Sequence, residues 1–263
     1  MSETLTIILP FFNEEGWIAR TVASLAAQSD TSFRLLLVDN GSTDTGAREA
    51  ADHAAAMGDR AAIVHCPTAG KIPAMAVGLA LVKTPLVAIC DADTWYPPDY
   101  VAIIRHLFAA NSSAAAVMAI DLYAPITHSA SLRRIERIMS KSRRHSKKCH
   151  AGGYAQAFRT GWLRAAGGFD IARWPYVLED HEIMHRLQPY GPTVYDPDHV
   201  CFPSDRRASR KAVSWTRGER LLYRYLPSCA MNWYFYRFLG RHLATRNSFG
   251  VALREKDWSS AIA

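Results

Sequence analysis

The sequence lacks the long hydrophobic run that a membrane-spanning helix needs, because no stretch of about 18 residues is both apolar and uncharged. It also lacks the Gly-x-Gly-x-x-Gly fingerprint of a dinucleotide-binding unit. The 5 cysteines are scattered without a Cys-x-x-Cys spacing, which argues against a zinc or redox pair and favours reduced thiols. We therefore expect neither a spanning helix nor a signal peptide, and the cytoplasm is the expected location.

What the sequence does contain is an uneven distribution of charge. Residues 1–132 carry 7 basic and 13 acidic side chains, whereas residues 133–263 carry 24 basic and 11 acidic ones. Two segments, 133–150 and 206–224, hold 8 and 7 Lys or Arg residues with a single Glu each. Such segments suit phosphates, an anionic membrane surface or nucleic acid. No nucleic-acid-binding motif accompanies them, so nucleic acid is not an expected partner.

The first half of the chain alternates short apolar runs with segments of helical spacing. The predicted strands cover residues 5–9, 35–38, 61–65 and 86–90. The predicted helices between them cover residues 14–28, 43–57 and 72–82. This alternation predicts an α/β fold with a mostly parallel central sheet flanked by helices. At 263 residues and 49% hydrophobic content, the chain is long enough to bury a large core.

Polar side chains follow three of these strands where each one ends. The runs are Pro10-Phe11-Phe12-Asn13-Glu14, Asp39-Asn40-Gly41-Ser42-Thr43-Asp44 and Asp91-Ala92-Asp93. Ligands of a parallel sheet bind beyond the carboxyl ends of its strands. Two acids one residue apart repel each other unless a cation lies near them, so Asp91 and Asp93 are candidates for binding a divalent metal. The alternative is that each run forms an ordinary turn or helix cap.

These motifs resemble the family 2 glycosyltransferases of the GT-A fold, and the resemblance covers about residues 4–207. Further matching motifs are Gly70-Lys71, Gly167-Gly168-Phe169-Asp170, Glu179-Asp180 and Arg186-Leu187. The resemblance implies a metal-dependent, inverting enzyme that moves one sugar from a nucleotide-diphosphate sugar, expected to be a UDP-sugar, to an acceptor hydroxyl. The Gln-x-x-Arg-Trp motif of processive members is absent, which favours a non-processive enzyme.

The resemblance also divides the chain. A GT-A domain is expected at 1–210, with its nucleotide-sugar half at 1–120 and its acceptor half at 121–210. A helical, aromatic and basic extension is expected at 211–263. The chain departs from the family pattern at one place, because Ala76 stands where Lys-x-x-x-x-Asn-x-Gly would have an amide.

By the same resemblance, five residues are expected to contact the nucleotide. Pro10, Phe12 and Glu14 line the pocket for the base and ribose. Asp39 accepts a hydrogen bond from the nucleobase, and a uracil imide N–H suits a carboxylate acceptor. Lys71 is expected to contact a phosphate or the base.

The diphosphate and metal are expected to lie near the Asp-x-Asp motif. Asp91 and Ala92 contact the sugar nucleotide, and Asp93 binds Mn²⁺ or Mg²⁺ together with Asp91, since hard oxygen ligands suit either ion. Arg206 and Arg207 are expected to clamp the diphosphate in a loop, with a solvated charge cluster as an equal alternative.

The acceptor side carries the expected catalytic carboxylates. By the same resemblance, Asp180, next to Glu179, is the candidate general base, and a helix N-terminus favours the ionised form that this role requires. The alternative is that both acids only cap the helix. The resemblance also makes His199 a candidate third metal ligand and His181 a weaker one, although a lone histidine is more often a packing residue.

The second half also suggests contact with a membrane. Leu132, Ile135, Ile138 and Met139 form an apolar stripe within the first basic segment, which is typical of a helix on an anionic membrane. The aromatic residues of 233–239 suit the same interface, with packing against the domain as the alternative. We therefore expect a peripheral membrane association and an acceptor on a lipid or glycolipid.

Two other functions are compatible with parts of the sequence. A sugar nucleotidyltransferase shares the architecture, but it requires a Gly-rich basic loop after the first strand, which residues 11–14 do not provide. A non-catalytic module that binds membrane or nucleic acid through the basic segments would leave the acidic strand ends without a purpose.

Overall fold

The strands of this protein form one mixed sheet in a computed structural model that describes residues 4–204 and 215–253. Within those residues the sheet has 8 strands in the order β3-β2-β1-β4-β7-β6-β8-β5. The strands are β1 Leu5–Phe11, β2 Phe33–Asp39, β3 Ala61–His65, β4 Leu86–Cys90, β5 Thr94–Trp95, β6 Ala116–Asp121, β7 Ala155–Arg159 and β8 Thr193–Pro203. β1 to β4 are parallel, and β8 is parallel to β6, whereas β7 and β5 are antiparallel to their neighbours.

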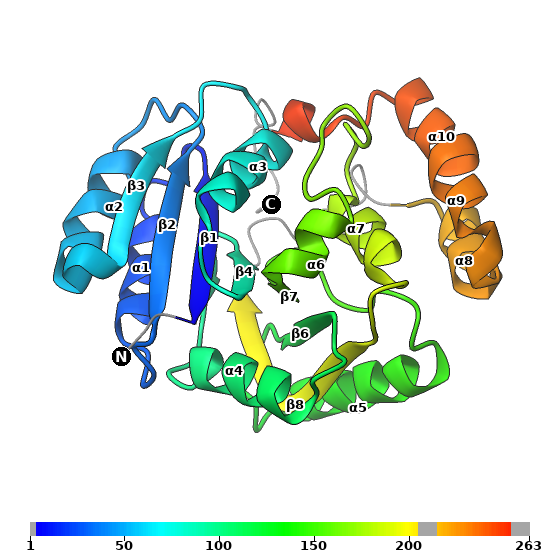
Figure 1. Ribbon diagram of the computed structural model, residues 1–263, viewed down its shortest axis with the longest axis horizontal. Helices are drawn as coiled ribbons and strands as arrows, with labels where there is room; N and C mark the ends of the chain where they lie inside the picture. Colours follow the sequence, from blue (N-terminus) through cyan, green and yellow to red (C-terminus); the bar gives the residue numbers. More distant parts are fainter. Residues whose placement is uncertain (1–3, 205–214, 254–263) are drawn as a thin grey trace.

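Helices cover both faces of the sheet (Figure 1). They are α1 Ile18–Ala26, α2 Gly46–Ala54, α3 Lys71–Leu81, α4 Tyr100–Ala110, α5 Ser129–Arg144, α6 Thr160–Ala165, α7 Glu179–Leu187, α8 Arg217–Tyr225, α9 Met231–Trp233 and α10 Gly240–Thr245. Shorter helical turns are η1 Ala55–Arg60, η3 Ser228–Ala230, η4 Tyr234–Leu239 and η5 Gly250–Leu253. Within the described residues, no helix is long and apolar enough to cross a membrane.

The predicted α/β architecture is confirmed, although the sheet is mixed rather than parallel throughout. β3 and β4 have the predicted bounds, while β1 continues two residues past the predicted end at Leu9. Pro10 has no N–H to donate, but the pairing of β1 with β4 already ends at Ile8, so the strand tolerates it. On the β2 side, the Phe11 carbonyl still accepts a hydrogen bond from the Asn40 N–H. The predicted helix at 14–28 begins only at Ile18, after Asn13 and Gly16 adopt positive φ angles.

Alternating strand residues supply two separate cores, one on each face of the sheet. Leu35 and Leu37 face a core that contains residues of α1, α2 and α4, whereas Leu36 and Val38 face a core that contains residues of α3, α6 and α7. The period-2 pattern follows from the pleat of a strand. The strand ends are therefore held between two packed layers, with their carboxyl edge at the surface.

The C-terminal helices α8, α9 and α10 lie together at the end of the molecule opposite α2 (Figure 1). Tyr234, Phe235 and Leu239 are fully buried, and the Phe235 ring lies 5.5 Å from Trp174 and 5.3 Å from His185, between ring centroids. These aromatic residues therefore pack against the domain, which was the alternative to contact with a membrane. Trp233 is 50% exposed and does not share this burial.

Gly78 sets how closely α3 approaches the sheet, and it provides a test of the fold. A Cβ atom at this position would lie 2.5 Å from Cγ2 of the buried Ile8. Gly78→Ala should therefore lower the free energy of unfolding by about 1–3 kcal/mol, since overpacking outweighs the better helix propensity of alanine. Urea unfolding followed by circular dichroism measures the change.

Gly161 of α6 is the matched control, because a Cβ atom there meets nothing within 4 Å. Gly161→Ala should leave the unfolding free energy unchanged or raise it by up to about 1 kcal/mol. Equal effects of the two substitutions would contradict the close packing of α3 on β1.

Candidate functional site

The Lys71 ammonium, in the first residue of α3, lies between carboxylates from two distant parts of the chain. Its Nζ is 2.6 Å from Asp91 Oδ1, just after β4, and 3.7 Å from Glu179 Oε1, at the start of α7. Burial opposes the positive charge, but Asp91 and Glu179 outweigh it and raise the pKa of the Lys71 amine. We call these three residues the Lys71 cluster. It joins the carboxyl edge of the sheet to α7.

Asn40 fixes the loop from which Lys71 extends. Its Oδ1 accepts a hydrogen bond of 2.7 Å from the Gly70 backbone N–H. Its Nδ2 donates to the carbonyls of Thr68 and Cys66 at 2.7 and 3.2 Å. Gly70 has a φ of 123°, which a side chain would strain. The sequence placed Asn40 in a strand-end run at the expected ligand edge, with an ordinary turn as the alternative, and its bonds to the Gly70 loop were not predicted.

Tyr96 connects the Asp91 backbone to the other half of the molecule. The Asp91 N–H donates to the Tyr96 hydroxyl at 2.9 Å, and that hydroxyl donates to the Tyr154 carbonyl at 2.9 Å. Ala92 is buried, and its carbonyl accepts from Thr21 Oγ1 at 2.8 Å. Ala92 therefore anchors the Asp-x-Asp turn to α1 through its backbone.

Asp93 is tied to the end of β8. Its Oδ2 accepts from Ser204 Oγ at 2.9 Å, and its carbonyl accepts from the Ser204 N–H at 2.9 Å. In residues 4–204 and 215–253, no three His, Cys, Asp or Glu side chains form a group that could hold a metal ion. The available donors are thus the carboxylates of Asp91 and Asp93. Such a pair fits Mg²⁺ or Mn²⁺ when substrate phosphates supply further ligands.

Asp39 lies at the same edge of the sheet, at the end of β2. Its Oδ1 accepts from the Ser42 N–H at 2.9 Å, and its Oδ2 is 3.7 Å from Nδ1 of His65. The Asp39 side chain is 16% exposed and His65 is 62% exposed. Asp39 is therefore oriented by the turn that follows it and remains accessible.

The loop after β1 is joined to the loop after β2 by hydrogen bonds. Asn13 Oδ1 accepts from the Thr43 N–H at 2.8 Å, and Asp44 Oδ2 accepts from the Glu15 N–H at 2.9 Å. The sequence did not assign a role to Asn13 or Asp44, because a contact between the two loops is not visible in either one alone. These bonds bring two of the three predicted strand-end runs together.

The predicted nucleotide contacts in the first loop differ in their accessibility. Phe12 is partly exposed, whereas Pro10 is buried and Glu14 is 4% exposed. Direct contact of Pro10 and Glu14 with a nucleotide stays a prediction. Arg206 and Arg207 lie outside the described residues.

Glu179 and Asp180 are adjacent, yet their environments push their pKa values in opposite directions. Burial raises the pKa of Glu179, and Lys71 offsets only part of this effect. Burial would also raise the pKa of Asp180, but His181 and Lys71 lower it below its usual value. Asp180 Oδ1 is 3.0 Å from His181 Nδ1 and accepts from the His181 N–H at 2.9 Å. Asp180 is therefore the carboxyl group that is more readily ionised.

Gly153, which precedes β7, leaves room between these groups. A Cβ atom here would lie 3.3 Å from Asp180 Cβ, 3.5 Å from Lys71 Nζ and 3.8 Å from Glu179 Oε1. Gly153 therefore borders the space shared by Asp180 and the Lys71 cluster.

The structure corrects the expectation for His199. Asp91, Asp93 and His199 do not form a metal-binding group among the described residues. The His199 side chain is completely buried, its ring centroid is 5.0 Å from that of Tyr100, and burial lowers its pKa to about 3. His199 is therefore a packing residue. His181 contacts Asp180 and the Trp215 ring, 4.8 Å away between centroids, rather than the Asp-x-Asp turn.

Comparison with known proteins gives a match over most of the sheet. Residues 6–166 match the family described as "Glycosyl transferase family 2". An uncharacterized glycosyltransferase of Mycobacterium tuberculosis is 36% identical over 91 residues, which are 35% of this chain and 37% of that relative. Glycosyltransferase GlyA of Streptococcus pneumoniae is 27% identical over 101 residues, which are 38% of this chain and 14% of GlyA. The chain thus spans little more than a third of the first relative.

Solved structures share the fold. The mannosyltransferase PcManGT of Pyrobaculum calidifontis, in complex with GDP-Man and Mn²⁺, has a TM-score of 0.68 and 19% identity and covers 100% of this chain and 76% of its own. Residues 1–349 of S. aureus TarS, in complex with UDP-GlcNAc, have a TM-score of 0.60 and 16% identity. The match covers 96% of this chain and 76% of the TarS chain. At these identities the likeness shows the fold alone, and it confirms the expected GT-A architecture.

The burial of His199 predicts a loss of stability in acid. Burial outweighs a hydrogen bond to the Met118 backbone, so the protonated ring is disfavoured in the folded protein. Since the pKa of about 3 lies below the unfolded value of about 6.5, the unfolded state binds the proton first and stability falls as the pH drops below about 6.5. The free energy of unfolding should therefore fall by about 2 kcal/mol less in His199→Phe than in the wild type between pH 7 and pH 5. Urea unfolding at both pH values measures it, and an identical loss in both proteins would contradict the prediction.

Proposed function

The chain belongs to glycosyl transferase family 2, and on this premise we propose that it transfers one sugar from a nucleotide-diphosphate sugar to an acceptor hydroxyl. The Lys71 cluster is the observation that carries the proposal. It places Asp91, from the expected nucleotide-sugar half, and Glu179, from the expected acceptor half, on one ammonium group at 2.6 and 3.7 Å. A donor sugar at the carboxyl edge of the sheet then faces the start of α7.

A UDP-sugar is the proposed donor. Asp39 supports uracil recognition, because an accessible carboxylate oriented by Ser42 can accept from the imide N–H of the base. Phe12 is partly exposed in the neighbouring loop and offers a flat ring. The two structural neighbours contain different nucleobases, GDP-Man in one and UDP-GlcNAc in the other. Asp39, rather than the neighbours, therefore favours uracil.

Asp91 and Asp93 are proposed to hold Mn²⁺ or Mg²⁺ together with the donor diphosphate, and the neighbour PcManGT was solved with Mn²⁺. When bound, the metal supplies a Lewis acid that stabilises the leaving nucleoside diphosphate. Lys71 places a further positive charge beside Asp91. Ser204 holds Asp93 at the end of β8, which limits the positions its carboxylate can adopt.

Asp180 is proposed as the general base that takes the proton from the acceptor hydroxyl. Its lowered pKa keeps the carboxylate ionised, and His181 orients one of its oxygens at 3.0 Å. The acceptor oxygen then attacks the anomeric carbon as the diphosphate leaves from the opposite face, so a single displacement inverts that centre. Glu179, whose pKa is raised, is proposed to position Lys71 rather than to act as the base.

The family match supports this function over the two alternatives from the sequence, a sugar nucleotidyltransferase and a non-catalytic binding module. An acceptor on a lipid or glycolipid, with the protein peripheral to an anionic membrane, remains part of the proposal. The basic residues of α5 and the exposed side chains of Leu132 and Leu221, at 48% and 59%, support it.

The nucleotide pocket predicts a specific thermal shift. UDP with Mn²⁺ should raise the melting temperature, because a ligand that binds only the folded state stabilises it by about 2.7 kcal/mol at a hundred times its Kd. Asp39→Ala should abolish most of that rise. Asp52→Ala removes an exposed carboxylate of α2 and should leave the rise intact. Equal stabilisation by every nucleoside diphosphate, or by none, would remove support for the uracil pocket.

The base assignment predicts a loss of turnover without a loss of donor binding. Asp180→Asn keeps the shape of the side chain but cannot take a proton, so release of UDP from a UDP-sugar with Mn²⁺ should slow on the order of a hundredfold or more. The thermal shift with UDP and Mn²⁺ should stay at the wild-type value. Asp198→Asn, in an exposed part of β8, is the control and should be active. Full activity of Asp180→Asn would rule out Asp180 as the base.

A further inference from the structure

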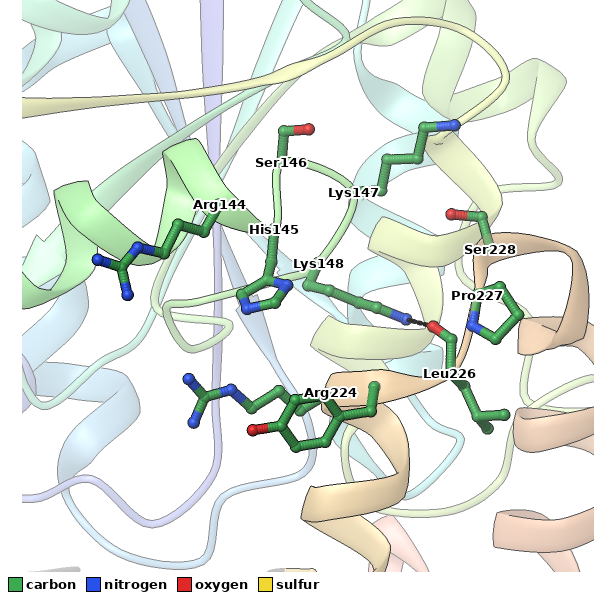
Figure 2. Close-up of a pocket in the computed structure, with 10 residues that line it drawn as sticks. Arg144, His145, Ser146, Lys147, Lys148, Arg224, Leu226, Pro227 and Ser228 are labelled. Carbon is green, nitrogen blue, oxygen red and sulfur yellow. Dashed lines mark hydrogen bonds between the residues drawn. The ribbon is translucent and has the colours of Figure 1, made fainter.

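A pocket of about 320 Å³ lies between the segment that ends α5 and the segment that ends α8 (Figure 2). The cations that line it are Arg144, Lys147 and Lys148 from the first segment and Arg224 from the second. Ser146 and Ser228 also line it, and none of the described residues that line it carries a carboxylate. The pocket shares no residue with the Lys71 cluster and is not used by the proposed reaction.

The positive charge of this pocket has no counterion within residues 4–204 and 215–253, where none of its four cations forms an ion pair with a carboxylate. Glu219 of α8 is already engaged, because it caps its own helix and is 3.1 Å from Arg246. The neighbouring cations crowd one another as well. Burial lowers the pKa of Lys141, and Arg137 and Arg224 lower it further.

Lys148 forms the inner wall of the pocket and is itself buried, with 8% of the residue exposed. Its Nζ donates to the Leu226 carbonyl at 3.0 Å, as the dashed line in Figure 2 shows, and lies 4.9 Å from the Tyr223 ring centroid. Burial without a carboxylate partner lowers its pKa to about 8. A buried ammonium group is costly unless it is paired, so an anion in the pocket would stabilise it.

The remaining cations can reach a ligand from solvent. Arg144, Lys147 and Arg224 are exposed, and in Figure 2 the guanidinium groups of Arg144 and Arg224 extend toward the same side of the pocket from α5 and α8. A guanidinium group binds a phosphate through two parallel hydrogen bonds. The size of the pocket admits a phosphate with part of the group that carries it.

Exposed apolar side chains lie on the same C-terminal segment. Tyr225, which lines the pocket, is 67% exposed, and Leu221 and Trp233 are 59% and 50% exposed. Apolar and aromatic side chains beside a basic site are typical of a surface at the level of lipid headgroups. The arrangement suits a phosphate that is attached to a lipid as well as a free one.

We propose that this pocket is a second anion site, separate from the donor site, and that it binds a phosphate group. The phosphate belongs either to the headgroup of an anionic lipid or to a soluble phosphate. Arg144, Lys147 and Arg224 contact it from the solvent side, and Lys148 contributes its charge from the inner wall. The proposal does not depend on the identity of the donor or of the acceptor.

Two double variants of the full chain test the proposal. Arg144→Gln/Arg224→Gln removes two charges from the pocket. Arg20→Gln/Arg48→Gln removes two exposed charges from α1 and α2, away from the pocket and from α5, and is the matched control. Cosedimentation with phosphatidylglycerol or phosphatidylcholine vesicles and the thermal shift with inorganic phosphate are measured for each protein. Lys147→Gln serves as a second pocket variant if the double variant does not reach the wild-type melting temperature.

The wild type should bind phosphatidylglycerol but not phosphatidylcholine vesicles, or it should be stabilised by inorganic phosphate. The pocket variant should weaken that response by roughly tenfold or more, and the control should weaken it by less than about threefold. Vesicle binding that the pocket variant loses assigns the phosphate to a lipid headgroup. A response to inorganic phosphate alone assigns it to a soluble phosphate. Equal losses in the pocket and control variants, or no response to either probe, would overturn the proposal.

Discussion

The ion pair of Lys71 is the interaction on which the candidate site depends. Without a positive charge between them, Asp91 and Glu179 would repel each other across the junction of the sheet and α7. With Nζ at 2.6 Å from one carboxylate and 3.7 Å from the other, the two can share one site. Asn40 and Gly70 hold the backbone that delivers Lys71, and Gly78 lets α3 lie close against β1. Packing of one helix thus determines the electrostatics of the site.

The same balance of burial and charge distinguishes the two acids of α7. Lys71 only partly offsets the burial of Glu179, whereas His181 and Lys71 together more than offset the burial of Asp180. Adjacent carboxyl groups with separated pKa values are typical of sites that divide acid and base roles. The basic pocket differs, because Lys148 is buried with cations around it and no carboxylate from the described part of the chain lines the pocket. Charge is therefore neutralised within the chain at one site and left for an external anion at the other.

Much of the site could be predicted from the sequence, since most of it consists of residues that directly follow strands. Asp39 and Asp91 lie at the predicted edge, and Lys71 was assigned there by resemblance. Its actual partners were not predicted, because an ion pair between residues 71 and 179 has no signature in either segment. The prediction that His199 binds a metal came from the resemblance. In the structure the residue lies in an irregular part of β8, and its ring packs in the core against Tyr100.

The sequence by itself determined the alternation of strands and helices, the acidic carboxyl edge and the basic second half, because hydrophobic period, turn residues and charge are local properties of a chain. Only the tertiary structure decided which carboxylates share Lys71, that Asp180 faces Gly153, and that Arg144 and Arg224 line one pocket. These pairings join residues that are tens of positions apart. They arise from the packing of helices on the sheet, so no local pattern could specify them.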